Sequence, residues 1–170
     1  DWVEHDAEEI WQSVVYCLKE ILTKYSSGDI DSVGITNQRE TVVLWDRQTG
    51  KPVHNAIVWQ DKRTDKICSK LRKTNNGYVK KTTGLVIDPY FSGTKIKWML
   101  DNVLETRSLL KEKRLLAGTI DTFLIWKLTK GAVHATDVSN ASRTLLMNLK
   151  TRDWDAKCLK VFGVPQTILP

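Results

Sequence analysis

Residues 31–45 read D-S-V-G-I-T-N-Q-R-E-T-V-V-L-W, a polar segment between two apolar runs. The first run, with Ile30, Val33 and Ile35, predicts a short buried strand, and residues 41–45 have the β-branched and aromatic composition of another. In open α/β sheets, ligands bind outside the carboxyl ends of strands, where loops point side chains into a crevice. Residues 36–40 occupy such a position, so they are a candidate ligand-binding loop.

Arg39 and Glu40 are the charged side chains of this loop. Arginine offers only hydrogen-bond donors and an ionised glutamate only acceptors, whereas each hydroxyl of a sugar or polyol both donates and accepts. The pair can therefore fix two neighbouring hydroxyls through charge-assisted hydrogen bonds. The alternative interpretation is a hairpin whose charges face water, or a local ion pair worth less than about 1 kcal/mol.

The rest of the chain alternates helical and strand patterns. Apolar residues at three- and four-residue steps predict an amphipathic helix over residues 6–25, with Asp6 as its N-cap. An apolar run at 56–59 follows a turn near Gly50 and predicts a hairpin or meander with residues 41–45. Further helices are predicted at 63–72, 94–104, 107–113, 119–128 and 155–162, and a further strand at 144–149. This mixture indicates an α/β fold in which helices cover a mixed sheet.

Other polar and aromatic side chains are candidates for the same site. Trp59 ends an apolar run, and its indole face offers an apolar wall to the C–H side of a polyol, although many tryptophans simply fill a core. Tyr90, in the loop D-P-Y-F-S-G, can bring a phenol to the site or close the loop against the core. Residues 136–144, T-D-V-S-N-A-S-R-T, predict a loop held by side-chain-to-backbone hydrogen bonds, in which Arg143 could be a ligand or ion-pair group.

The composition, 170 residues with 41% hydrophobic and 27% charged, is typical of one soluble globular domain. No apolar run reaches the roughly 20 residues that a membrane-spanning helix needs, so the cytoplasm is the expected location. The net charge is +6, and Lys and Arg concentrate at positions 62, 63, 66, 70, 72, 73, 80, 81, 95 and 97. Their helical spacing, without interleaved aromatic residues for base stacking, favours solvated helix faces over a nucleic-acid surface.

The chain lacks the usual signatures of metal and phosphate sites. Its three cysteines are far apart and its three histidines show no paired ligand spacing, which argues against a disulfide framework and a zinc site. It contains no GxxxxGK[ST], GxGxxG, GxSxG or HExxH motif, so it has no recognisable phosphate-binding loop.

Six stretches together resemble one family in order and spacing along essentially the whole chain. They are W-V-E-H-D-A-E-E-I-W (2–11), G-I-T-N-Q-R-E-T (34–41), T-G-K-P-V-H-N-A-I-V-W-Q-D (49–61), T-G-L-V-I-D-P-Y-F-S-G-T-K (83–95), G-T-I-D-T-F-L-I-W (118–126) and T-D-V-S-N-A-S-R-T (136–144). The chain resembles the glycerol kinases, a group within the FGGY carbohydrate kinases. The resemblance implies a ribonuclease-H-like, actin-like ATPase fold, with residues 1–170 forming part of the first of two domains.

The resemblance also implies the site and the reaction. Arg39, Glu40 and Tyr90 match residues that bind the hydroxyls of glycerol, and Trp59 matches the residue that contacts its carbon backbone. The implied reaction transfers the γ-phosphoryl group of ATP, with Mg²⁺, to glycerol and gives glycerol 3-phosphate. The phosphate loop is expected before Asp1, and the catalytic Asp and the nucleotide-binding domain beyond residue 170.

We therefore assign no catalytic residue to this chain, and none of Asp88, Asp121 and Asp137 is taken as the catalytic base. Residues 1–170 alone are expected to lack kinase activity. Relatives imply a homo-oligomer, a dimer or tetramer, and no nucleic-acid or membrane partner. Three alternatives remain open: another FGGY sugar or polyol kinase, a catalytically inactive truncated relative, and a basic binding module.

Overall fold

The computed structural model describes all residues 1–170. Its strands are β1 (Glu4–His5), β2 (Val42–Asp46), β3 (Ala56–Ile57), β4 (Leu115–Thr119), β5 (Met147–Asn148) and β6 (Asp153–Trp154). Its helices are α1 (Ala7–Leu22), α2 (Asp65–Thr83), α3 (Ser92–Asn102), α4 (Glu105–Lys111), α5 (Ile120–Leu128), α6 (Val138–Ala141) and α7 (Ala156–Phe162), with short 3₁₀ turns at Ser27–Asp29 and Gln166–Ile168. No helix combines the length and hydropathy needed to cross a membrane.

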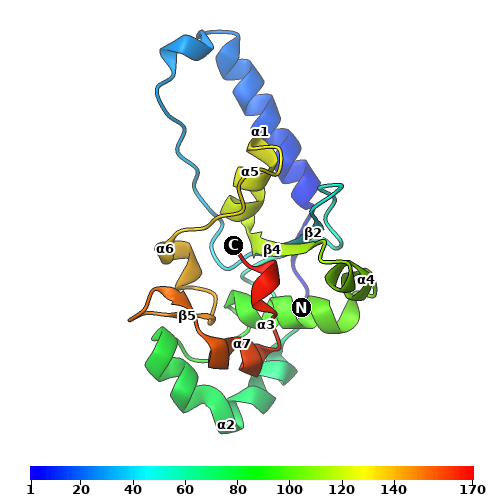
Figure 1. Ribbon diagram of the computed structural model, residues 1–170, viewed down its shortest axis with the longest axis vertical. Coiled ribbons are helices and arrows are strands. Elements are labelled where there is room, and N and C mark those ends of the chain that lie inside the picture. The colour runs from blue at the N-terminus through cyan, green and yellow to red at the C-terminus, as the bar shows by residue number, and fades with distance from the viewer.

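The central sheet has the strand order β1-β3-β2-β4 and separates two layers of helices (Figure 1). Each neighbouring pair is antiparallel, and β2 and β4 pair along five positions, from Val42 opposite Thr119 to Asp46 opposite Leu115. Strands that are buried on both faces carry apolar residues at consecutive positions rather than at alternate ones. The pattern V-V-L-W of β2 is of this kind, and the predicted α/β fold with helices on the sheet is confirmed. The sheet was predicted to be mixed, but all the strand pairs within residues 1–170 are antiparallel.

Successive residues of β2 supply two different cores. Val42 and Leu44 belong to the larger apolar cluster, which includes residues of α2, α3 and α7. Val43 and Trp45 belong to the smaller cluster, which packs against α1 and α5. This follows from the two-residue period of a strand, which points neighbouring side chains to opposite faces.

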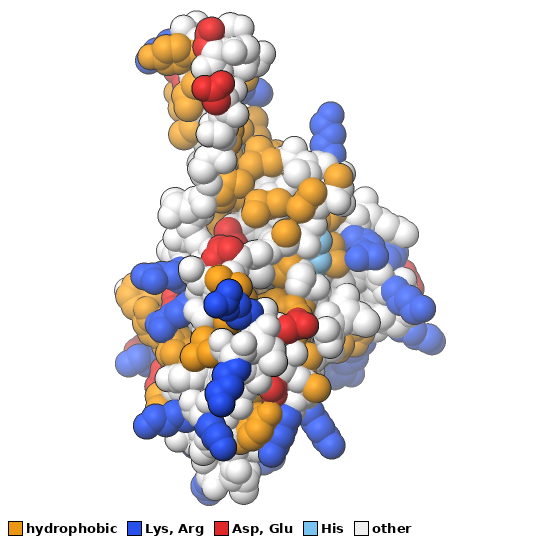
Figure 2. Space-filling view, turned by 60° about the vertical axis from the view of Figure 1, so that its left-hand side comes forward, with side chains coloured by type: hydrophobic (Ala, Val, Ile, Leu, Met, Phe, Trp, Pro, Cys, Tyr) orange, Lys and Arg blue, Asp and Glu red, His pale blue; other side chains and the backbone are white.

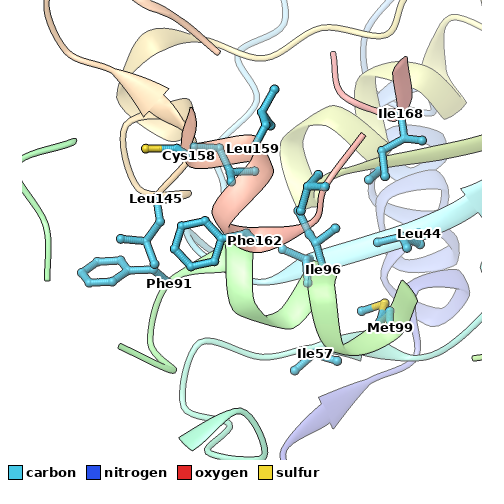
Figure 3. Packing of buried hydrophobic residues seen from close by; sticks show 14 of the residues in the cluster. Leu44, Ile57, Phe91, Ile96, Met99, Leu145, Cys158, Leu159, Phe162 and Ile168 are labelled. Carbon is cyan, nitrogen blue, oxygen red and sulfur yellow. The ribbon is translucent and has the colours of Figure 1, made fainter. Parts of the chain in front are cut away.

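Side chains from distant segments meet within the larger cluster. Phe91, directly before α3, lies with Leu145 and with Phe162 of α7 in Figure 3. These side chains are at most 8% exposed, so burial of their apolar surface fixes α7 against α3. This packing also holds the loop before α3 in place, and that loop carries Tyr90.

Helix α1 forms as its sequence predicts and projects from the body of the molecule (Figure 1). Asp6 caps it by accepting hydrogen bonds from the backbone N–H groups of Glu8 and Glu9. The helix ends at Leu22, three residues before the predicted end.

The strand predicted from Ile30, Val33 and Ile35 is wrong. These residues follow α1 in an irregular segment, and their side chains are 37%, 64% and 37% exposed. A strand gains its stability from hydrogen bonds to a neighbouring strand, and no strand of this chain pairs with this segment.

Other boundaries also differ from those predicted. Strands β1 and β4 were not predicted; β4 contains a glycine and comes directly after a charged turn. Helix α2 extends to Thr83, eleven residues beyond the predicted end, and the predicted strand at 144–149 shrinks to Met147–Asn148. A single helical turn, α6, lies inside the predicted loop at 136–144.

Most of the ten Lys and Arg residues between positions 62 and 97 face solvent, as their helical spacing predicts. The exposed members are Lys62, Lys66, Lys70, Arg72, Lys73, Lys80 and Lys81. Figure 2 shows Lys and Arg side chains dispersed over the lower part of the molecule, whereas hydrophobic side chains are prominent on the projecting part. Two exceptions are Arg63, whose side chain pairs with Glu4 and Asp61, and Lys95; both side chains are fully buried.

Candidate functional site

The polar segment ends in a turn that gives its two charged side chains different surroundings. Glu40 has a φ of 65°, in the left-handed region that few residues other than glycine adopt. Its side chain is only 3% exposed, whereas Arg39 is exposed and has no hydrogen-bond partner in the chain. Thr41 holds the turn by donating its N–H to the Gln38 carbonyl at 3.3 Å and its hydroxyl to the Gln38 side chain at 2.9 Å. Strained backbone of this kind is concentrated at functional sites.

The buried carboxylate of Glu40 is paired with Arg143. Arg143 Nε donates to Glu40 Oε1 at 2.6 Å, and the arginine side chain is 32% exposed. The other carboxylate oxygen, Oε2, accepts no hydrogen bond from the chain and is not sealed from solvent. Because each carboxylate oxygen can accept a hydrogen bond, Glu40 retains acceptor capacity for an incoming hydroxyl.

An aromatic wall stands beside this ion pair. The rings of Trp59 and Tyr90 lie 5.4 Å apart, centre to centre, at an interplanar angle of 57°. The guanidinium carbon of Arg143 is 5.8 Å from the ring centre of Tyr90 and 4.9 Å from that of Phe91. Arg143 therefore connects Glu40 to the aromatic residues, and the Tyr90 hydroxyl and the Trp59 indole N–H have no partner within the chain.

Two cavities are lined in part by Tyr90 and Asp88. The larger, of about 470 Å³, is lined by the segments 59–62 and 88–90 and by Asp65. The other, of about 330 Å³, is lined by Val86, Asp88, Tyr90, Phe91 and Arg143. Tyr90 lines both spaces, so a movement of its ring would change the shape of each. Neither space is lined by Arg39 or Glu40.

A network around Asp121 ties the polar segment to the loop that carries Arg143. Asn37 donates to the Asn140 side chain at 2.9 Å and accepts from the backbone N–H of Asp121 at 3.2 Å. Asp121 Oδ2 in turn accepts from Thr136 at 3.1 Å and from Asn140 at 3.3 Å, and its Oδ1 accepts from Thr119. Because Asp121 is 3% exposed and these partners occupy both oxygens, its evident role is to position the two loops.

The structure thus brings together three of the four predicted site residues. Glu40, Trp59 and Tyr90 form one chain of contacts through Arg143, whereas Arg39 remains uncommitted at the surface. The sequence left the role of Arg143 open; the structure shows it as an ion-pair partner.

The burial of Lys95 beside the site was missed, because the residue was grouped with the solvated basic residues. It lies four residues after Phe91 and four before Met99, both buried, so its place on the core face of a helix was the available signal. Its Nζ donates to the backbone carbonyls of Tyr90 at 2.5 Å and Phe91 at 3.2 Å. Burial lowers the pKa of Lys95 from 10.5 to about 7, against the opposing attraction of Glu40 and nearby aspartates.

No group of three or more His, Cys, Asp or Glu side chains is placed to hold a metal ion. The only buried carboxylates near the aromatic wall, Glu40 and Asp61, are each paired with an arginine. We therefore assign no residue of this chain to Mg²⁺ or to nucleotide phosphates.

Known proteins are similar to this chain over nearly its whole length. The family profile described as "FGGY family of carbohydrate kinases, N-terminal domain" matches residues 1–170. Glycerol kinase from Shewanella pealeana is 57% identical over 172 residues, which cover 99% of this chain and 35% of the relative. Glycerol kinase from Mycoplasmoides gallisepticum is also 57% identical, over 99% of this chain and 34% of the relative. The chain thus spans about a third of the length of these relatives.

Solved structures show the same similarity. The crystal structure of Plasmodium falciparum glycerol kinase with ADP matches 99% of this chain and 34% of that chain, with a TM-score of 0.89 and 42% identity. A xylulose kinase from Rhodospirillum rubrum matches 99% of this chain and 34% of its own with a TM-score of 0.84, but at 18% identity this shows the fold alone.

Proposed function

The chain belongs to the FGGY family of carbohydrate kinases, and on that basis we propose that it supplies the glycerol-binding residues of a glycerol kinase. The proposed reaction of the whole enzyme transfers the γ-phosphoryl group of ATP to a terminal hydroxyl of glycerol and gives glycerol 3-phosphate. Its relatives at 57% identity are glycerol kinases, and one solved relative contains ADP, which supports both glycerol and a nucleotide as substrates.

The observation that carries this proposal is the free oxygen of the Glu40 carboxylate next to an aromatic wall. A polyol hydroxyl can donate to Oε2 of Glu40, while the Arg143 ion pair holds the carboxylate through Oε1. Trp59 and Tyr90 present ring surface to the carbon chain, and the Tyr90 hydroxyl is free to bond a second oxygen. In this proposal Arg39 adds charged donors from the surface, because its guanidinium is not engaged by the chain.

These residues align the substrate, which is one of three requirements of phosphoryl transfer. The other two are neutralisation of phosphate charge and a carboxylate that accepts the hydroxyl proton. We propose that ATP, Mg²⁺, the phosphate loop and the catalytic Asp meet outside residues 1–170. A homo-oligomeric state, implied by the resemblance, and a cytoplasmic location, expected from the sequence composition, remain predictions.

The proposal is tested in a chimeric protein, in which this chain replaces the matching third of the Shewanella pealeana glycerol kinase. Isothermal titration with glycerol should show saturable binding. Glu40→Gln and Arg39→Ala should each weaken it roughly tenfold or more, since each removes a charge-assisted hydrogen bond.

Arg72→Ala, at an exposed arginine of α2, is the matched control and should bind as the unchanged chimera does. Absence of glycerol binding, or full affinity in both site variants, would refute the proposal. Saturable binding of xylulose or xylitol in place of glycerol would instead indicate another FGGY substrate. Salt-dependent binding to an oligonucleotide would favour the basic binding module.

A further inference from the structure

Lys95 is a charged side chain where the fold would accept an apolar one. It lies in the first turn of α3 with 0% exposure, among side chains of the larger apolar cluster. Placing an ammonium group there is costly, because the charge loses its hydration. Its complete burial also excludes direct contact with a substrate that arrives from solvent.

The hydrogen bonds of Lys95 all go to the loop that carries Tyr90. Its Nζ donates to the carbonyl oxygens of Tyr90 and Phe91, at 2.5 and 3.2 Å. The N–H of Tyr90 is held as well, because it donates to the Asp88 side chain at 3.0 Å. Both peptide groups of Tyr90 are therefore fixed by side chains.

This anchoring matters because the Tyr90 side chain has little support of its own. It is 36% exposed, and its hydroxyl has no partner in the chain. Its ring contacts Trp59 on one side and Phe91 on the other, at centre distances of 5.4 and 5.2 Å. A shift of the backbone at Tyr90 would move the ring that lines both cavities.

We propose that Lys95 is a positioning residue of the substrate site: its buried amino group donates hydrogen bonds to the Tyr90 and Phe91 carbonyls and thereby keeps the Tyr90 ring against Trp59. The inference rests on the proposed function, since it assumes that Tyr90 contacts the polyol. The carboxylates of Glu40, Asp61 and Asp88 and the thiol of Cys68 are the titratable groups whose charge acts on Lys95. The carboxylates favour its protonated form, which makes the stronger hydrogen bonds.

Lys95→Met tests the proposal, because methionine fills a similar volume without a donor or a charge. Lys97→Met is the matched control: it changes the same residue type in the same helix, at a side chain that pairs only with Asp101, at 3.0 Å. Both variants are made in the chimeric protein described above. In Lys95→Met, the Kd and KM for glycerol should rise roughly tenfold while kcat falls less than about threefold, and Lys97→Met should match the unchanged protein.

Hydrogen exchange gives a readout that does not depend on substrate. The backbone amides of Asp88, Tyr90 and Phe91 should exchange roughly tenfold faster in Lys95→Met than in the unchanged protein, and exchange in the β2–β4 pair should not change. A purely structural role would instead accelerate exchange throughout the larger core and lower kcat and affinity together. Unchanged exchange at 88–91 would overturn the proposal.

The two proposals fail in different ways. If the unchanged chimera does not bind glycerol, the proposed function is refuted and the exchange experiment still decides the anchoring. If the unchanged chimera binds glycerol and Lys95→Met binds it equally well, the positioning role is refuted and the function stands.

If Lys95→Met does not fold, Lys95→Gln is measured instead; its shorter side chain keeps a donor without the charge. An intermediate loss of affinity is expected there, and full affinity with unchanged exchange would overturn the proposal.

Discussion

Replacing Arg143 by methionine removes the partner of a buried carboxylate. Breaking a fully buried ion pair costs about 3–5 kcal/mol, and breaking an exposed pair less than about 1 kcal/mol. Glu40 is 3% exposed and the Arg143 side chain 32%, which places this pair between those limits. After this discount for solvent screening, we expect the lost ion pair to cost about 2 kcal/mol.

Arg143 also contacts an aromatic ring, and this contact is lost in the same variant. Its guanidinium carbon is 4.9 Å from the ring centre of Phe91, a contact worth about 0.5–1 kcal/mol. Arg143→Met should therefore lower the free energy of unfolding by about 2–3 kcal/mol in total. Urea denaturation of this chain at pH 7, followed by circular dichroism, measures the change.

A double-mutant cycle separates the ion pair from the aromatic contact. Glu40→Gln, Arg143→Met and the double variant should give a coupling free energy of about 1–2 kcal/mol between the two positions. Arg72→Met on the exposed face of α2 is the control and should change stability by less than about 0.5 kcal/mol. A coupling free energy within error of zero would show that Arg143 does not hold the Glu40 carboxylate in place. The proposal that Glu40 Oε2 accepts a hydrogen bond from a substrate hydroxyl would then lose its basis.

Two further predictions concern the surroundings of the site. Burial lowers the pKa of Lys95 to about 7 from 10.5, so between these pH values the unfolded chain binds one more proton than the folded chain. Stability should therefore rise with pH, by up to about 1.4 kcal/mol per pH unit. Urea denaturation from pH 7 to 10 should show that this component is missing in Lys95→Met, and equal slopes in both proteins would contradict the lowered pKa of Lys95. Gly93→Ala should destabilise the chain by about 1–3 kcal/mol, because its Cβ would lie 2.8 Å from the Thr144 carbonyl oxygen. Gly77→Ala should instead stabilise α2 by about 0.5–1 kcal/mol, because its Cβ would meet no atom within 4 Å outside its own helical backbone and chain neighbours. Thermal denaturation should shift the midpoint temperatures of the two variants in opposite directions, and the same shift in both would refute the steric argument.

Elements with strong local signals were predicted correctly from the sequence. Asp6 caps α1 and Asp155 caps α7, because a side-chain oxygen at an N-cap acts on backbone groups only two or three residues away. The β-branched and aromatic run of β2 is a strand at almost the predicted bounds. For the two helices, the capping hydrogen bonds lie within the stretch of sequence that predicts them. Strand β2 also needs hydrogen bonds from β3 and β4, but its β-branched and aromatic composition is a strong local signal for a strand.

The failed predictions concern segments whose structure depends on distant partners. The segment with Val33 has the composition of a strand but no neighbour in the chain to pair with. Strand β4 was missed although it forms the longest pairing of the sheet, because a five-residue run that contains Gly118 carries a weak local signal. Composition alone does not decide whether a strand forms when its hydrogen bonds come from elsewhere in the sequence.

The sequence alone determined which residue types the candidate site contains and which family the chain resembles, because donors, acceptors and aromatic rings can be read from a short motif. Only the tertiary structure decided which of them meet. Glu40 and Arg143 are 103 residues apart in the sequence, and they meet because the hydrogen bonds of Asp121 hold their two loops together. Lys95 points into the core, although its charge predicted a position in solvent. The energies that settle these placements, burial and charge pairing, depend on distances that exist only once the chain has folded.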